Sequence, residues 1–335
     1  MKKAICFDDV LLVPQMSMIK SRSEIDISSD LDEKICLDIP IISSPMDTVS
    51  ESPMAAAMSS CGGVSIIHRY NSIDVQCRHV GSMPADSLVG AAIGVTGDYL
   101  DRATALYDSG ANILCVDIAH GHHVLMKRAL SHLREIFGDG VHIMAGNVAT
   151  LDGFNDLADW GADSIRVGIG GGSICSTRVQ TGHGMPTLES VLRCARTDRD
   201  AKLIADGGLR TSGDIVKALG AGADFVMLGS MLAGMEESPG EMVMVNGGAR
   251  KAYRGMASKD AQIDWRGHMA SVEGVSSTVP YRGPVAQKIQ EIVMGIRSGL
   301  SYSGAKNLVE FRTKAQFIEQ TTAAATEGSA HINLW

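Results

Sequence analysis

Residues 202–230, KLIADGGLRTSGDIVKALGAGADFVMLGS, contain two short apolar runs separated by a helix-like segment. The runs 202–208 and 225–230 have the length and composition of buried strands, and each ends in Gly or Ser. The segment 211–222 has helical spacing and closes on the Gly expected just beyond a helix C-terminus. This order of strand, helix and strand is typical of a parallel sheet covered by helices.

The same unit recurs along the chain. Six further apolar runs alternate with helix-like segments, at 39–47, 63–69, 89–95, 113–121, 142–148 and 164–170. Eight consecutive units favour a closed (β/α)₈ TIM barrel over a doubly wound sheet. Most runs end in Gly, Ser, Asp, Asn or His, which puts polar residues at the C-terminal ends of the strands, where barrels keep their active sites. We therefore expect residues 1–335 to form a single α/β barrel domain, closed by a helix at 285–300.

A long segment follows the eighth strand. Residues 237–284 are rich in Gly, Ser and Met and show no sustained period. A segment of this length inside a compact domain is usually a lid or a binding segment. We expect a flap within about 237–284. The C-terminal tail is expected to be flexible, with Leu334 and Trp335 available for docking.

Composition limits the classes of partner. The 335 residues are 45% hydrophobic and 20% charged with a net charge of −8, as in a folded soluble protein. No Lys/Arg cluster supports a nucleic-acid or membrane surface, and no apolar run reaches the roughly 20 residues of a membrane span. Asp8 and Asp9 interrupt the apolar N-terminal patch, which argues against a secretory signal. Seven cysteines without a CxxC spacing are typical of reduced thiols, so a cytoplasmic location is expected.

A glycine-rich loop follows the sixth strand. Residues 168–178 read GIGGGSICSTR. Glycines let backbone groups converge on a ligand because they adopt positive φ at little cost. The pattern is not the GxGxxG dinucleotide fingerprint, which should follow the first strand. A tight turn is the alternative, but a thiol in a polar loop at the catalytic end of a barrel makes Cys175 a candidate nucleophile.

The loops after the seventh and eighth strands are candidates for phosphate binding. IADGG and MLGS end these strands, and barrels commonly bind a phosphate there through Gly and Ser amides. Ordinary turns are the alternative. The Asp206 carboxylate would suit a ribose diol. AHGHH (119–123) offers three imidazoles, but zinc needs three or four convergent ligands, so loop histidines exposed to solvent are favoured.

Taken together, the motifs resemble one family. FDDVLLVPQ, SSPMDTV, GGVSIIHR, AGNVAT, RVGIGGGSICSTR, IADGGLRTSGDI, VMLGSMLAGMEESPGE and YRGM are similar, in order and over nearly the whole chain, to the IMP dehydrogenase / GMP reductase family. The resemblance implies a barrel, usually a homotetramer, that acts on a purine nucleotide with a nicotinamide cofactor. It also implies a cysteine that attacks purine C2 to give a covalent thioimidate.

The resemblance assigns roles residue by residue. Cys175 matches the nucleophile, Thr177 the threonine that follows it, and Glu273 the catalytic glutamate of the reductase flap. The matches to substrate contacts are Ser44, Met46, Ser173, Asp206, Gly208, Gly229, Ser230, Tyr253, Gly255 and Met256. The matches to cofactor-side or supporting positions are Asp117, Asn147 and Arg166. The backbone carbonyls of Gly170, Gly172 and Cys175 match a monovalent-cation (K⁺) loop, in which Gly171 replaces the usual proline.

The flap separates the two branches of the family. Dehydrogenases carry an Arg-Tyr pair that activates water, whereas this flap has only Arg266 and then Glu273. The segment after the second strand also lacks the CBS modules of most dehydrogenases, and SYSGA (301–305) resembles the reductases. AHGHH, ESPGE, RTKAQF and the EGSAH tail are closer to dehydrogenases.

Because hydrolysis needs a base and a positioned water, the missing pair favours GMP reductase. Such a reductase would use NADPH, with Arg69 as a candidate contact for the extra phosphate of the cofactor; a loop arginine exposed to solvent is the alternative. The alternative is an IMP dehydrogenase without CBS modules that uses NAD. A non-catalytic nucleotide-binding regulator is a third reading, against which Cys175, Thr177 and Glu273 together argue.

Overall fold

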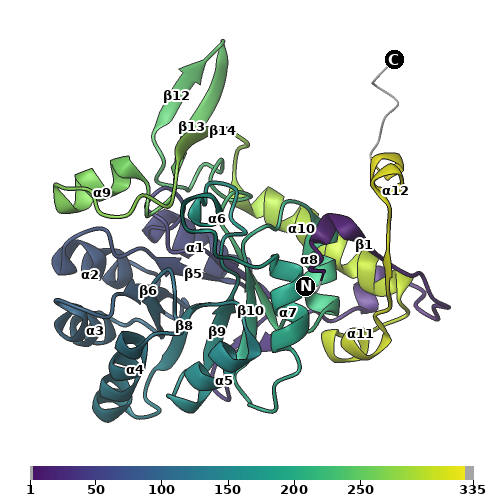
Figure 1. Cartoon of the computed structure of the whole chain (residues 1–335), viewed down its shortest axis with the longest axis horizontal. Coiled ribbons are helices and arrows are strands. Elements are labelled where there is room, and N and C mark those ends of the chain that lie inside the picture. Colours follow the sequence, from purple (N-terminus) through teal and green to yellow (C-terminus); the bar gives the residue numbers. More distant parts are fainter. Residues whose placement is uncertain (1–2, 329–335) are drawn as a thin grey trace.

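The computed structural model describes residues 3–328, so the expectation for Leu334 and Trp335 lies outside the described chain. Eight parallel strands form a closed barrel in the order β10-β11-β4-β5-β6-β7-β8-β9, drawn at the centre of Figure 1. Their bounds are β4 (Ile41–Ser43), β5 (Val64–Ile67), β6 (Gly90–Ile93), β7 (Ile113–Asp117), β8 (His142–Val148), β9 (Ser164–Val167), β10 (Lys202–Asp206) and β11 (Phe225–Leu228). The predicted TIM barrel is confirmed, and every strand lies within its predicted run.

Helices follow the strands and cover the barrel. They are α1 (Ser52–Ser60), α2 (Ile73–Gly81), α3 (Tyr99–Asp108), α4 (Val124–Phe137), α5 (Leu151–Asp159), α7 (Thr187–Cys194), α8 (Ser212–Gly220) and α10 (Val285–Tyr302). Local sequence fixes where they start: Thr211 and Asp214 form a reciprocal capping box at α8. The predicted closing helix is α10. Short helices α6 (Thr177–Thr181), α11 (Leu308–Lys314) and α12 (Thr322–Glu327) complete the described set.

The barrel interior is filled by side chains. Ile42, Ile204 and Phe225 belong to one fully buried cluster, which also includes Leu31 and Leu37 from a hairpin formed by β2 (Ser29–Asp30) and β3 (Cys36–Leu37). Because Phe225 begins β11 and Leu37 precedes β4, this hairpin seals the N-terminal end of the barrel. The opposite, C-terminal end is left open for a binding site.

The segment 237–284 is more regular than expected. It contains β12 (Met242–Val245), β13 (Gly248–Arg254) and β14 (Ser276–Pro280), which form an antiparallel sheet, and α9 (Lys259–Arg266). Figure 1 shows this sheet standing away from the barrel, with α9 beside it. Asn246 and Gly247, with φ of 51° and 78°, form the turn between β12 and β13. An Asn-Gly pair between apolar residues is a strong hairpin signal, so the sequence did contain a sign of this structure.

Residues near both termini pair with each other. β1 (Val10–Leu12), which follows the short helix η1 (Phe7–Asp9), runs antiparallel to β15 (Phe317–Glu319). The helix η2 (Arg22–Glu24) lies between β1 and β2. The strands β1 and β15 lie far apart in the sequence, so no local pattern predicted that they pair. Among residues 3–328, no helix has the length and apolar character that crossing a membrane requires.

Candidate active site

A cavity of about 530 Å³ lies at the C-terminal ends of the barrel strands. Every residue to which the sequence assigned a role lines it, from Ser44 after β4 to Glu273 in the flap. The predicted substrate residues end or follow three neighbouring strands, β10, β11 and β4, or lie in and after β13, except Ser173, which lies in the loop after β9. The predicted cofactor residues follow or end β5, β7, β8 and β9, which form the other arc of the barrel.

The loop after β9 presents the thiol. Gly168 has a φ of +147°, and a Cβ on it would lie 1.9 Å from the carbonyl oxygen of Asp206, so only glycine lets this loop pass so close to β10. Cys175 is exposed, and its Sγ donates a hydrogen bond of 3.2 Å to Thr177 Oγ1. Thr177 begins α6. The structure therefore brings the two residues into direct contact in front of the cavity.

The flap docks onto this loop through the backbone. The Ser176 amide donates to the carbonyl of Glu273 at 2.9 Å, and the Val275 amide donates to the carbonyl of Ile174 at 3.0 Å. The Glu273 carboxylate accepts a bond of 3.1 Å from the Ser271 hydroxyl. Glu273 and Cys175, far apart in sequence, thus line one cavity because two short chain segments pair there.

Glycine and hydroxyl groups gather where a phosphate was predicted. A Cβ on Gly229 would lie 3.2 Å from Met46 Sδ and 3.2 Å from the Tyr253 hydroxyl, so a larger residue would fill this part of the cavity. Burial raises the pKa of Tyr253 to about 12, and its hydrogen bond with Ser173 partly opposes that shift. The phenol is therefore a neutral donor at physiological pH. Gly208, Ser230 and Ser173 line the same region.

One buried guanidinium joins the two arcs. Arg166 is 7% exposed and donates to Asp117 Oδ1 at 2.5 Å and to Asp206 Oδ2 at 2.9 Å. Asn147 Nδ2 donates to the same Asp206 oxygen at 2.9 Å. Burial by itself lowers the pKa of Arg166, but Asp206 and Asp117 outweigh it and raise this pKa well above its usual value. Arg166 therefore stays charged and orients both carboxylates.

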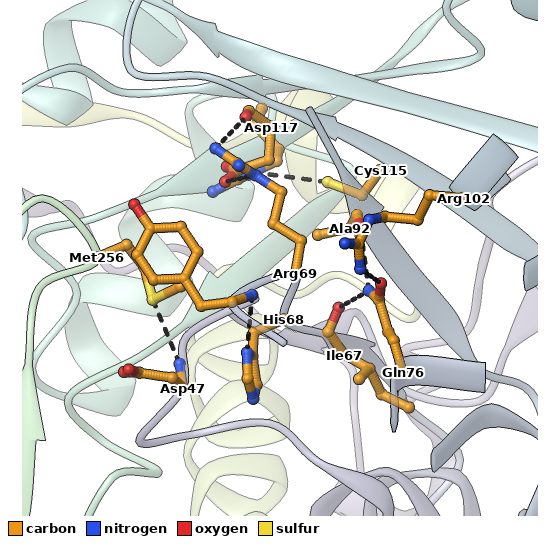
Figure 2. Close-up of polar contacts among 12 residues, drawn as sticks. Asp47, Ile67, His68, Arg69, Gln76, Ala92, Arg102, Cys115, Asp117 and Met256 are labelled. Atoms are coloured by element: carbon orange, nitrogen blue, oxygen red, sulfur yellow. Dashed lines mark hydrogen bonds and ion pairs between the residues drawn. The ribbon is translucent and has the colours of Figure 1, made fainter. Parts of the chain in front are cut away.

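Arg69 is paired rather than free. Its Nε lies 3.7 Å from Asp117 Oδ2, and its Nη2 donates to the Asp117 backbone carbonyl at 3.3 Å. Figure 2 shows the side chain reaching across to Asp117. The guanidinium also lies 5.5 Å from the centroid of the Tyr70 ring. At the lower left of Figure 2, away from Asp117, the thioether of Met256 accepts a bond of 3.3 Å from the Asp47 amide.

Four polar side chains that line the cavity were not predicted from the sequence. They are Tyr70, next to Arg69, and Gln262, Arg266 and Ser271 from the flap. The sequence signal for them is weak, because flap residues gain their position only from docking onto the barrel. Arg266 was noted only for lacking a tyrosine neighbour.

The predicted cation loop is partly engaged within the protein. The Gly172 carbonyl accepts a bond of 3.1 Å from the Cys175 amide, so one of the three expected ligands already has a partner. A Cβ on Gly171 would lie 2.4 Å from Oγ1 of the buried Thr187. Thr187 therefore leaves no room for a side chain at position 171, which accounts for the glycine found in place of proline.

The loop histidines have structural partners. His122 contacts Asp156 at 2.7 Å, and His123 accepts from the Leu125 amide at the start of α4. Within residues 3–328, no group of three His, Cys, Asp or Glu residues is arranged to hold a metal ion. These imidazoles thus stabilise the loop after β7 and the helices next to it.

Comparison with known proteins agrees with this geometry. A family model described as the IMP dehydrogenase / GMP reductase domain matches residues 4–331. An inosine-5'-monophosphate dehydrogenase from Nitrosopumilus maritimus is 33% identical, with 98% of each chain covered. A GMP reductase from Leishmania major is 31% identical, with 98% of this chain and 97% of the relative covered.

A solved structure has nearly the same fold. It is a cysteine-to-alanine variant of GMP reductase from Trypanosoma brucei in complex with guanosine 5'-monophosphate, with a TM-score of 0.94, 31% identity and 99% and 98% of the two chains covered. The alignment with the Nitrosopumilus protein spans 471 positions, more than the 335 residues of this chain, because the relative has residues without a counterpart here. The chain belongs to the IMP dehydrogenase / GMP reductase family, an oxidoreductase family of purine metabolism.

Proposed function

We propose that this protein is a GMP reductase that converts GMP and NADPH to IMP, ammonia and NADP through a covalent bond between Cys175 and purine C2. The observation that carries the proposal is the docking of Glu273 onto the cysteine loop, where its backbone carbonyl accepts a bond of 2.9 Å from the Ser176 amide. The flap brings the Glu273 carboxyl group to the same cavity as the thiol and has no Arg-Tyr pair to activate water. The adduct of Cys175 with GMP would have a proton donor for its departing amine, and the thioimidate that remains would have no Arg-Tyr pair to hydrolyse it.

The substrate is proposed to lie across the β10, β11 and β4 arc. Gly208, Gly229, Ser230 and Ser173 would hold the 5'-phosphate through amides and hydroxyls, with the neutral Tyr253 phenol as a further donor. Asp206 would accept from the ribose hydroxyls through Oδ1, since Arg166 and Asn147 already bond to Oδ2. Ser44, Met46, Gly255 and Met256 would enclose the base.

The chemistry assigns one task to each catalytic residue. The Cys175 thiolate attacks C2 of GMP, and the Thr177 hydroxyl, which already contacts Sγ at 3.2 Å, relays a proton from Glu273 to the departing amine. Ammonia leaves, and the purine stays bound through a C2–S bond. A reduced nicotinamide, when bound, supplies a hydride to C2. The electron pair of the C2–S bond then returns to Cys175 and restores the thiolate.

The polar groups along the β5, β7, β8 and β9 arc are of the kinds that bind a dinucleotide. Asp117 and Asn147 offer hydrogen bonds at the strand ends, and Arg69 is the cation proposed for the extra phosphate of NADPH. Arg166 is buried and would act by holding Asp117 in place. A homotetramer and a potassium ion at Gly170, Gly172 and Cys175 stay predictions, and no step above depends on either.

A second function is favoured by one observation. Arg266 lines the cavity, and its guanidinium has no ion pair within residues 3–328. In an IMP dehydrogenase without CBS modules, which would use NAD, such a group would activate water against the thioimidate. Arg266→Gln would then abolish formation of XMP, whereas the reductase reaction does not need this guanidinium.

Two assays on the purified protein test the proposal. NADPH oxidation with GMP and NAD reduction with IMP are followed at the nicotinamide absorbance, and the purine products are separated by chromatography. We expect IMP and ammonia from the first mixture in equal amounts. Reduction of NAD with IMP, together with no oxidation of NADPH with GMP, would overturn the reductase assignment in favour of the dehydrogenase.

A further inference from the structure

Gln262 makes three hydrogen bonds to the backbone of its own flap. It lies in α9 and is 3% exposed. Its Nε2 donates to the carbonyl oxygens of Ala257 and Ser271, both at 2.9 Å, and its Oε1 accepts from the Ala270 amide at 2.8 Å. A buried amide with every bond made to main-chain groups fixes the path of the chain around it.

The bonds of Gln262 lead directly to the catalytic segment. Ser271 lies two residues before Glu273, whose own amide donates to the Ala257 carbonyl at 3.1 Å. Ala257 thus receives one bond from Gln262 and one from Glu273. Residues 267–271 are exposed, and Met269 is 51% exposed, so no buried apolar side chain anchors this stretch. Gln262 is therefore its main buried tether.

The helix that carries Gln262 is itself attached to the barrel. Trp265 stacks on Tyr70 with ring centroids 5.8 Å apart and an angle of 16° between the planes. The guanidinium of Arg102 lies 6.0 Å from the Trp265 ring. Arg102 is 3% exposed and donates to Gln76 at 2.7 Å, and Gln76 donates to the carbonyls of Ile67 and Ala92, as Figure 2 shows. These contacts fix α9 to the ends of β5 and β6.

We propose that Gln262 is a positioning residue that transmits this fixed location to Glu273 and so holds the proton donor at the cysteine loop. The inference rests on the proposed function, which gives Glu273 its role. Gln262 would act on the deamination step, because none of the proposed phosphate and ribose contacts comes from residues 257–273, the flap segment that Gln262 holds. A misplacement of about 1 Å costs up to ~100-fold in rate, which sets the expected effect.

Two substitutions separate hydrogen bonding from packing. Gln262→Glu keeps the size of the side chain but removes both N–H donors, while Gln262→Met keeps an unbranched side chain of similar length and removes all three bonds. Lys259→Ala, an exposed position of the same helix, is the matched control. We expect kcat with GMP and NADPH to fall about 10- to 100-fold in both Gln262 variants, with KM for GMP within about twofold of the wild type.

Hydrogen exchange supplies a readout independent of activity. Peptides that contain Ser176 and Val275 report the two amides that join the flap to the cysteine loop. We expect faster exchange there in the Gln262 variants and unchanged exchange in Lys259→Ala. In a Glu273→Gln background, Gln262→Met should lower kcat little further, because both changes remove the same action.

Each outcome decides between the claims. Wild-type kcat in both Gln262 variants, or an equal loss in Lys259→Ala, would overturn the positioning role while leaving the reductase intact. If Gln262→Met lowers kcat as much in the Glu273→Gln background as it does in the wild type, Gln262 acts on general stability instead. A wild-type protein that does not oxidise NADPH with GMP refutes the proposed function, and the exchange experiment then still tests the tether.

Discussion

The Ser176 amide donates a hydrogen bond of 2.9 Å to the Glu273 carbonyl. This bond joins the residue after the thiol to the flap residue proposed as proton donor. It comes from backbone pairing rather than from the side chains that do the chemistry. The geometry of the site can therefore survive substitution of either catalytic side chain, which makes those side chains separately testable.

Replacement of Glu273 by Gln should remove the proton donor and keep the docking of the flap. We expect kcat for GMP reduction to fall about 10²- to 10⁴-fold, the usual worth of a general acid, with little change in KM. Steady-state kinetics measures this directly. Glu241→Gln, at an exposed glutamate of the same flap, should behave as the wild type. Equal activities of the two variants would take Glu273 out of the mechanism.

Replacement of Arg166 by Met should destabilise the fold. It leaves Asp117 and Asp206 partly buried without their cation, which costs about 3–5 kcal/mol of the free energy of unfolding. Urea denaturation followed by circular dichroism measures the loss. Arg199, which also pairs with two aspartates but at the surface, is the matched control, and Arg199→Met should leave the midpoint nearly unchanged. Similar midpoints for both variants would contradict the role given to burial.

Replacement of Gly171 by Ala should strain the cysteine loop. The new Cβ would lie 2.4 Å from Thr187 Oγ1, and Thr187 is only 4% exposed and cannot move away freely. Overpacking of this kind costs about 1–3 kcal/mol. Thr187→Ala in the same protein should restore much of the loss, so thermal unfolding of the two single variants and the double variant gives a coupling energy. Strictly additive effects would show that the two residues do not interfere.

The Asp32–His142 contact should stabilise the fold at neutral pH, and this contribution to the free energy of unfolding should disappear in acid. The hydrogen bond of 2.7 Å from His142 lowers the pKa of Asp32 to about 2, although partial burial opposes the shift. Because the folded pKa is depressed, the stabilisation is present above pH 4 and disappears as the pH falls through about 2. Asp32→Asn should cost about 1 kcal/mol at pH 6, after allowance for solvent screening.

The acid dependence is read from unfolding curves at several pH values. The wild type and Asp32→Asn should converge in stability near pH 2. Asp200→Asn, at an exposed aspartate, should follow the wild type throughout. A constant gap between the wild type and Asp32→Asn from pH 6 to pH 2 would show that Asp32 acts through packing.

Replacement of Arg69 by Ala tests the proposed cofactor contact. Loss of a charge-assisted bond to the extra phosphate should raise KM for NADPH by about tenfold or more and leave KM for NADH nearly unchanged. Asp117 keeps its bond of 2.5 Å to Arg166, so the wall of the cavity should persist. Arg78→Ala on α2 serves as an exposed control. An equal rise for both cofactors would assign Arg69 to the support of Asp117.

Much of this protein could be predicted from its sequence. The alternation of apolar runs and helical segments depends on residues near in sequence, so it predicted all eight strands and the barrel. The polar residues at the strand ends, such as Cys175, Asp206 and Ser230, were found because a parallel barrel brings all of its C-terminal strand ends to one face. The same argument explains why the predicted site residues of the barrel line one cavity, whereas those of the flap, such as Glu273, reach it by docking.

Contacts between distant segments were decided only by the tertiary structure. No local pattern indicates that Arg166 bridges Asp117 and Asp206, that Gln262 binds Ala257, Ala270 and Ser271, or that Thr187 fills the space beside Gly171. The flap lacks a sustained period, so its hairpin depends on an Asn-Gly turn and its helix on the stacking of Trp265 against Tyr70. Secondary structure follows from nearest neighbours along the chain, but the position of a flap residue follows from where a separate surface lets it pack.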